Sequence, residues 1–235
     1  MNSNHQNFII MGRELLYYIG AGGTVVIPDS VNQIKDRAFR GRFGLTAVVI
    51  PDSVTKIGEG AFAECSGLTS VTLPDSITEI IRYVFYGCSS LTEIVIPSGV
   101  TKIGQDAFSN CRSLKEIVIP SGVAKISSGT FTNCRSLTAV TIPDGVTAIG
   151  SNAFCGCISL RSVNIPDGAI KIGKFAFYAC TALTSVVIPG SIASIAKEAF
   201  GRCHSLTIHA PAESYAARYA KKMNIKFKAL AANNA

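Results

Sequence analysis

The chain has 235 residues, of which 48% are hydrophobic and only 16% are charged, with a formal net charge of +7. Disordered chains combine low hydrophobicity with high charge, so this composition predicts a folded chain. No uninterrupted apolar run approaches the roughly 18 residues of a membrane-spanning helix, so we expect no membrane insertion.

Residues 1–20 are predicted to form an N-terminal cap, in which the apolar stretch 8–18 turns back on itself at Gly12 as a hairpin. Residues 1–8 contain no basic segment followed by a long apolar stretch, as a secretory signal would. Two compartments therefore stay open: the cytoplasm, or the cell surface or exterior if a leader is absent from this sequence.

Residues 21–206 repeat with a period of 23, which three residue types share. A fixed period between about 20 and 50 residues is typical of solenoids, propellers and repeat arrays. One such unit cannot bury its own apolar residues, so we expect stacked units to share one core. The recurring residues are Pro28, Pro51, Pro74, Pro97, Pro120, Pro143, Pro166 and Pro189; Phe39, Phe62, Phe85, Phe108, Phe131, Phe154, Phe177 and Phe200; and Leu45, Leu68, Leu91, Leu114, Leu137, Leu160, Leu183 and Leu206.

The unit 91–111 shows the predicted local structure. Its residues 91–96 alternate as in a strand, with Leu91, Ile94 and Ile96 inward and Glu93 and Val95 outward. The following proline ends the strand because it has no N–H to donate. A second inward pair is expected at residues 100 and 103, and a short helical or 3₁₀ turn at residues 107–108.

Residues 207–235 are predicted to form a C-terminal cap of one helix and one strand, followed by a tail. Tyr215, Tyr219 and Met223 share one helical face and are expected to lie on the last coil. Residues 225–230 are expected to form the final strand. The basic residues of this region are interpreted as a solvated face, because no aromatic residues interleave with them as single-strand nucleic-acid binding requires. They are Arg218, Lys221, Lys222, Lys226 and Lys228.

The unit pattern LTxVxIPxxVxxIGxxAFxxC resembles the BspA-like leucine-rich repeat of bacterial proteins over residues 20–206. Residues 212–220 resemble a common C-terminal cap of that family. The resemblance implies a single-domain leucine-rich repeat solenoid, right-handed, with parallel β-strands, short 3₁₀ or helical turns, eight repeats of 23 residues and a cap at each end. Family members are often surface or secreted proteins linked to adhesion, matrix binding and host-cell contact.

The cysteines follow the same period. Metal sites need clustered ligands, so a spacing of 23 residues without histidine partners predicts no metal. Adjacent coils would set equivalent Cα atoms about 5 Å apart, which disulfides could bridge, but stacked side chains point the same way and the number in register is odd. We therefore predict buried, reduced thiols that act as small apolar groups, and expect Cys155 to be more exposed. The cysteines in register are Cys65, Cys88, Cys111, Cys134, Cys157, Cys180 and Cys203.

No pattern indicates catalysis. His5, His204 and His209 have no Ser, Cys or Asp partner at a motif spacing, and nucleotide-binding and hydrolase motifs do not occur. The aspartates that follow the prolines suit turns. We expect no catalytic residue, cofactor or metal. The row Lys56, Lys102, Lys125 and Lys171 is interpreted as a solvated flank, with an anion-binding stripe as the alternative.

The outward strand positions are the predicted partner-binding surface, because they form one long, mildly apolar strip. The predicted function is a non-enzymatic, monomeric scaffold that binds a protein or matrix-like ligand, with adhesion as the role that the resemblance implies. The alternatives are a carbohydrate-binding solenoid and a basic binder of anionic surfaces or nucleic acid. The predicted residues are Val49, Thr72, Glu93, Val95, Glu116, Val118, Thr141, Asn164 and Val187, and a competing aromatic patch contains Tyr83, Tyr86, Phe175 and Tyr178.

Overall fold

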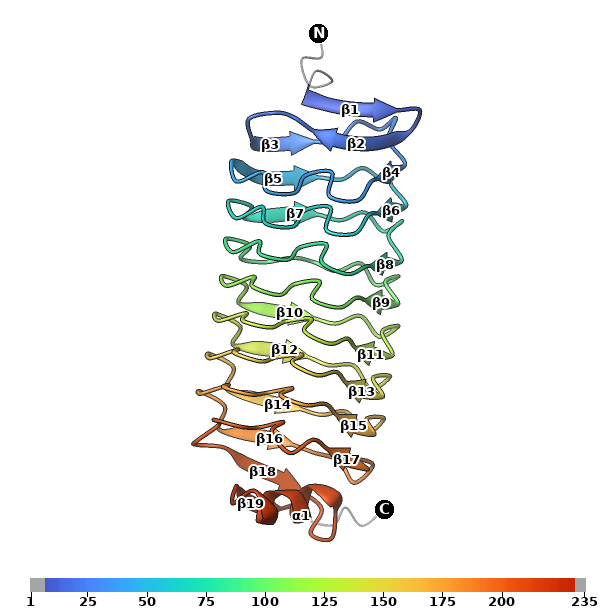
Figure 1. The fold of residues 1–235 in the computed structure, drawn as a ribbon. Coiled ribbons are helices and arrows are strands. Elements are labelled where there is room, and N and C mark those ends of the chain that lie inside the picture. The colour runs from blue at the N-terminus through green and yellow to red at the C-terminus, as the bar shows by residue number, and fades with distance from the viewer. Residues whose placement is uncertain (1–6, 231–235) are drawn as a thin grey trace.

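The chain winds into a stack of coils, with a hairpin at one end and a helix at the other (Figure 1). The structure is a computed structural model that describes residues 7–230, which form a parallel β-solenoid of about nine turns. The predicted fold class, a solenoid of 23-residue repeats, is confirmed. Residues 1–6, which include His5, and residues 231–235 of the predicted C-terminal cap lie outside the described part.

The first strand column consists of the segments that precede the repeated prolines. Its strands alternate buried and exposed residues, because successive side chains of a strand point to opposite sides. Within residues 91–96, Leu91, Ile94 and Ile96 are buried while Glu93 and Val95 are exposed, as predicted. The strands of this column are β3 (Gly23–Val26), β5 (Leu45–Val49), β7 (Ser70–Thr72), β10 (Glu116–Val118), β12 (Ala139–Thr141), β14 (Ser162–Asn164), β16 (Ser185–Val187), β18 (Thr207–Ala210) and β19 (Lys226–Ala229).

A second strand column follows the opposite edge of the stack (Figure 1) and was not predicted as β-structure. The sequence indicated only an inward pair in this part of the unit, and Val100 and Ile103 are indeed buried. After the hairpin, each strand has two residues, of which the first is the more exposed. The strands are β1 (Phe8–Met11), β2 (Glu14–Tyr18), β4 (Gln33–Ile34), β6 (Lys56–Ile57), β8 (Glu79–Ile80), β9 (Lys102–Ile103), β11 (Lys125–Ile126), β13 (Ala148–Ile149), β15 (Lys171–Ile172) and β17 (Ser194–Ile195).

Both strand columns are interrupted. The first divides into β3-β5-β7, β10-β12 and β14-β16-β18-β19, and the second into β1-β2-β4-β6, β8-β9 and β11-β13-β15-β17. The prediction of a strand at residues 91–96 was wrong, since this segment keeps the alternation but has no ladder. A continuous first column would set Glu93 opposite Glu116, and a continuous second column would set Lys102 opposite Lys125. Like charges directly opposite each other disfavour pairing, and these two gaps have such pairs. The gaps between β12 and β14 and between β6 and β8, where Lys56 would face Glu79, have none.

The Ala-Phe turns, which are the segments around each repeated phenylalanine, form a backbone ladder that crosses every coil boundary from Tyr18 to Ala199. Each aromatic N–H donates to the carbonyl oxygen of the residue just before its equivalent on the next coil, as from Phe39 to Ala61, at 2.7–3.0 Å. Instead of the expected short helical or 3₁₀ turn, these segments take consecutive turns, and no helix is assigned between residues 8 and 214. Left-handed residues such as Tyr83 (φ 61°) interrupt any right-handed helical turn there.

The core is a stack of aromatic rings that runs the length of the solenoid. The eight repeated phenylalanines are almost fully buried, and their neighbouring centroids lie 4.8–5.6 Å apart with nearly parallel planes. Tyr18 continues the stack at one end, 5.1 Å from Phe39. Tyr219 closes it at the other end, where it meets Phe200 edge-on at 6.1 Å. Both tyrosines come from the capping elements, so the caps cover the core directly.

Each end carries the elements that the sequence predicted. β1 and β2 pair antiparallel around Gly12, and β2 then pairs parallel with β4. At the other end, α1 (Tyr215–Lys222) begins at Ser214, whose side-chain oxygen accepts a hydrogen bond from the Ala217 N–H at 3.2 Å. Tyr219 is buried against the last coil, and β19 adds a parallel strand to β18. The predicted hairpin, helix and final strand are confirmed.

Candidate functional site

The sheet face, which is the outward side of the first strand column, contains all the residues predicted to bind a partner. The register sets Val49 opposite Thr72, Val118 opposite Thr141 and Asn164 opposite Val187. All nine residues are exposed except Val187, which is half-buried. The two central valines are the most exposed, Val95 at 82% and Val118 at 65%. The predicted residues therefore share one face. Seven of them lie in three hydrogen-bonded stretches, and Glu93 and Val95 lie in the gap between the first two.

The sheet face ends in two lysines of the predicted final strand, which were interpreted only as part of a solvated basic face. β19 extends both outward rows of the first column, because Lys226 lies opposite Thr207 and Lys228 opposite His209. Both lysines are exposed. The strand itself was predicted, but its parallel pairing with β18, which places both lysines on the sheet face, was not. The sheet face thus has acidic residues near its middle and basic residues at one end.

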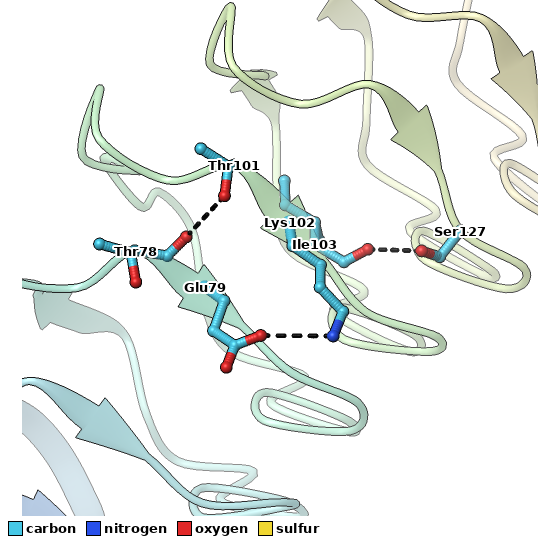
Figure 2. Close-up of polar contacts among 6 residues, drawn as sticks. All are labelled: Thr78, Glu79, Thr101, Lys102, Ile103 and Ser127. Atoms are coloured by element: carbon cyan, nitrogen blue, oxygen red, sulfur yellow. Dashed lines mark hydrogen bonds and ion pairs between the residues drawn. The ribbon is translucent and has the colours of Figure 1, made fainter.

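The lysine row lies on the second strand column, at the exposed first position of each short strand. Figure 2 shows how one of these lysines is held: Lys102 on β9 points toward Glu79 on β8, with 3.3 Å between its Nζ and the carboxylate oxygen. Beside this pair, the Thr101 hydroxyl donates to the Thr78 carbonyl oxygen (Figure 2). The pair is exposed on both sides, so it stabilises the fold little. Because Lys102 is already paired with a carboxylate, the lysine row is not a continuous series of free cations that could bind anions.

The competing aromatic patch lies on the turn face, which is the outward side of the Ala-Phe turns. There Tyr83 and Tyr86 border a hollow of about 500 Å³, and their ring centroids are 5.9 Å apart in an edge-to-face arrangement. Gly60 and Ala63 line the hollow one coil before the tyrosines. Arg37 and Arg40 line it one coil earlier still. The hollow therefore forms where a coil with small outward residues lies between two coils with large ones.

Polar groups complete the lining of this hollow. Arg40 is paired with Glu64 at 3.0 Å, and Glu59 is paired with Arg82, which lies outside the lining, at 2.6 Å. Asp106, Ser109 and Asn110 line the far edge, and Ser109 is buried. The predicted aromatic patch contained these tyrosines but neither the arginines nor the small residues of the lining. Comparing the same turn position in successive units would have found them, because Arg40, Ala63 and Tyr86 differ greatly in size.

The second half of the predicted aromatic patch lies four coils away. Phe175 and Tyr178 repeat the edge-to-face pair, with centroids 5.2 Å apart. Their rings are already in contact with the chain's own cations, Lys174 over Phe175 at 4.8 Å and Arg202 over Tyr178 at 5.4 Å. A Cβ atom placed on Gly201 would come within 2.7 Å of the Tyr178 ring. The structure therefore separates the predicted patch into two sites, of which this one is filled.

The seven cysteines in register form a ladder of thiols in the core. All seven are buried, as predicted. Each Sγ donates to the carbonyl oxygen of the phenylalanine on the preceding coil, at 3.0–3.2 Å. Burial raises the pKa of the Cys134 thiol to about 12 and that of Cys65 to about 12. The thiolate is the reactive form of cysteine, so these residues act as structural donors.

Cys155 differs from the other cysteines. It is half-buried, and burial raises its pKa as well. It occupies the outward turn position that holds Tyr86 and Tyr178 in other coils. The expectation that Cys155 is the more exposed thiol is confirmed.

The histidines do not converge on a site. His204 is exposed near the C-terminal cap, and His209 is half-buried on β18. Within residues 7–230, no group of three His, Cys, Asp or Glu side chains could hold a metal ion. No helix in this described part is long and apolar enough to cross a membrane.

Comparison with known proteins identifies the repeat. A family model described as a BspA type leucine rich repeat region, in six copies, matches residues 11–138 and 124–216. The chain belongs to this family. The thiol ladder and the phenylalanine stack are thus the core of a BspA-type solenoid, and the resemblance noted in the repeat pattern is confirmed.

Solved structures of bacterial leucine-rich repeat proteins share this fold. One from Bacteroides ovatus is 26% identical, with a TM-score of 0.66, covering 93% of this chain and 71% of that one. The leucine-rich repeat protein of T. pallidum is 30% identical, with a TM-score of 0.58, covering 93% and 91%. The pneumococcal vaccine antigen PcpA, 17% identical with a TM-score of 0.50 over 94% and 45%, is similar in fold alone. None of these is named as an enzyme, and no curated protein sequence matches the chain.

Proposed function

We propose that this BspA-type chain is a non-enzymatic scaffold that binds a protein ligand through its sheet face. The observation that carries the proposal is the exposed valine row: Val26, Val49, Val95 and Val118 are 39–82% exposed at equivalent strand positions. Thr72 interrupts the row, which therefore consists of two adjacent pairs, Val26 with Val49 and Val95 with Val118. Exposed apolar patches mark interaction sites. Leucine-rich repeat solenoids typically serve as protein-interaction scaffolds, which supports the same function.

Charge narrows the kind of ligand. Glu93 and Glu116 lie two positions before the two most exposed valines, and both are exposed. Complementary charges guide association and fix the register of a complex. The ligand expected here is therefore an extended protein surface with an apolar strip bordered by basic groups. A matrix or cell-surface protein would suit the adhesion role that the family resemblance implies.

Charge reversal tests this proposal. The immobilised chain would capture ligands from a bacterial lysate and from an extracellular-matrix preparation, and each captured protein would be titrated against variants. Glu93→Lys combined with Glu116→Lys should weaken binding about tenfold or more, because it replaces attraction with repulsion at the centre of the strip. Circular dichroism would verify that the variant is folded.

The matched control combines Asp144→Lys with Asp167→Lys. It changes the net charge by the same amount at exposed turn positions, where Ser98, Ser121 and Gly190 show that the aspartate is dispensable. This control should bind within about twofold of the wild type, since rim and remote charges contribute little. Unchanged binding by the sheet-face variant would show that the strip is not the ligand site.

A further inference from the structure

We propose that the hollow on the turn face, lined by Arg37, Gly60, Ala63, Tyr83 and Tyr86, is a binding site for a neutral saccharide. The site lies on the Ala-Phe turns, whereas the proposed protein-binding surface lies on the first strand column. The proposal is therefore independent of what the sheet face binds. The volume of the hollow, about 500 Å³, falls within the range of small-ligand sites.

The shape of the hollow suits a ring inserted edge-first between two walls. A Cβ atom placed on Gly60 would lie 3.8 Å from Arg37 Cγ and 3.9 Å from Tyr83 Cβ, so the glycine lies directly between the two walls. Since coils follow each other at about 4.8 Å, the walls are two coils, or about 10 Å, apart at the backbone. The missing side chain at Gly60 and the short one at Ala63 leave this space open.

The aromatic wall provides a stacking surface. The C–H groups on one face of a sugar ring are apolar and pack against an aromatic ring, while the hydroxyls at its edge stay free for hydrogen bonds. Among residues 7–230, cation–π contacts occupy Phe175, Tyr178 and Tyr215 but neither Tyr83 nor Tyr86. The tyrosine pair beside the hollow is thus free of cation–π contacts, and both of its rings are partly exposed, although they pack edge-to-face on each other.

The polar lining matches the hydroxyls of a sugar. Ser109 is only 3% exposed, and its hydroxyl oxygen accepts from Asn110 Nδ2 at 3.3 Å, but within the described part it donates to no acceptor. Its proton is therefore available to a ligand. Arg37 makes no ion pair within residues 7–230, so its guanidinium donors are also available. Vicinal hydroxyls, which both donate and accept, pair readily with such guanidinium and hydroxyl groups.

The charge balance favours a neutral ligand. Arg37 and Arg40 face Glu59, Glu64 and Asp106 within the lining, and Arg82 outside it neutralises Glu59. A phosphate or a basic side chain would meet as many like charges as opposite ones, which gives no net attraction. A neutral sugar meets no charge repulsion and can use the same groups as hydrogen-bond partners.

The experiment uses saturation-transfer NMR on the full chain with a panel of neutral methyl glycosides and short oligosaccharides, followed by titration of any that bind. Tyr83→Asn removes the stacking ring at a left-handed position, where Asn152 stands in another coil. Ala63→Tyr fills the hollow with the side chain that the same position holds in Tyr86 and Tyr178. Both variants should weaken saccharide binding about tenfold or more, since stacking anchors dominate binding at such sites.

Phe175→Asn is the matched control, because it makes the same kind of change in the filled aromatic pair. It should bind within about twofold of the wild type, as a residue outside the contact surface would. The proposal is overturned if no saccharide in the panel binds the wild type, or if Tyr83→Asn and Ala63→Tyr bind as the wild type does. It is also overturned if these two variants instead release a protein captured by the wild type, which would assign the hollow to a peptide.

Discussion

The thiol ladder can be tested at a single rung, because the chain contains a comparable cysteine outside it. Cys134 is fully buried, and its Sγ donates to the Phe108 carbonyl oxygen at 3.2 Å. Cys134→Ala removes the sulfur and this hydrogen bond. The carbonyl oxygen keeps a second donor, the Cys111 backbone N–H at 3.2 Å. No buried carbonyl is left without a partner, so the full cost of desolvating an unpaired group does not apply.

The expected cost follows from what is removed. A buried group the size of one methylene is worth about 0.8 kcal/mol of transfer free energy. The void adds about as much again, because the phenylalanine stack holds the coils apart and the site cannot collapse. A weak thiol hydrogen bond contributes about 0.5 kcal/mol. Cys134→Ala should therefore lower the free energy of unfolding by about 2 kcal/mol.

Cys155→Ala is the control for this measurement. Cys155 is half-buried and makes no side-chain hydrogen bond within the described part, so its replacement should cost about 0.5 kcal/mol or less. The two cysteines lie in adjacent coils, so both variants report on the same region of a nearest-neighbour stack. Urea unfolding under reducing conditions, followed by circular dichroism, would compare them. Equal costs for the two variants would refute the structural role of the ladder.

Four further outcomes are expected. Burial raises the pKa of Cys134 from 9.0 to about 12, so between these pH values the folded state keeps a thiol proton that the unfolded state releases. The free energy of unfolding should therefore fall as pH rises from 9 toward 12, and urea midpoints that stay constant would contradict this. A thiol reagent at neutral pH should modify Cys155 alone before denaturation, and a second fast thiol would argue against the buried ladder. Tyr219→Phe removes the hydrogen bond to the Lys197 carbonyl oxygen at 3.0 Å and should lower the free energy of unfolding by about 1 kcal/mol. Tyr219→Ala also uncovers the last coil and should lower it by about 3 kcal/mol, and thermal unfolding would measure both variants. Tyr83→Asn should change stability by less than about 1 kcal/mol, because relief of a left-handed tyrosine offsets the lost ring contact; a larger loss in urea unfolding would mark Tyr83 as structural.

Most of the fold could be predicted because stacking places like residues on like. The period alone sets each phenylalanine over the next and each cysteine over the next, and both columns lie in the core as expected. The capping helix could be predicted from the shared face of Tyr215 and Tyr219. Tyr18 was harder to place, because it precedes Phe39 by 21 residues and therefore falls outside the repeat register.

The strand ladders could not be predicted in detail. Two-residue strands such as β9 are too short to show an alternating pattern, and whether they pair depends on the separation of neighbouring coils. The missing strand at residues 91–96 has the same pattern as its neighbours. The like-charged positions Glu93 and Glu116 mark only its boundary with β10, and they become visible only when two repeats are compared across the stack. Its boundary with β7, where Ser70 would face Glu93, has no such pair.

The two candidate sites differ in how far the repeat pattern could predict them. The repeat pattern averages over units, whereas the hollow exists because one unit departs from its neighbours, with Gly60 and Ala63 between arginines and tyrosines. The sheet face was found because its residues alternate with core residues in nearly every unit. A consensus therefore predicts shared surfaces well and single-coil sites poorly.

The division between a uniform core and a varied exterior explains how one solenoid can hold two independent sites. Stability comes from the phenylalanine stack, the thiol ladder and the turn ladder, which cross coil boundaries even where both strand columns are interrupted. The outward side chains take no part in these interactions, so the side chains of Tyr83 and Val95 can change without loss of the stack. Since each coil contacts only its neighbours, a change at either position should act locally. A change at Tyr83 should therefore reduce saccharide binding but not protein binding, and a change on the sheet face should reduce protein binding but not saccharide binding.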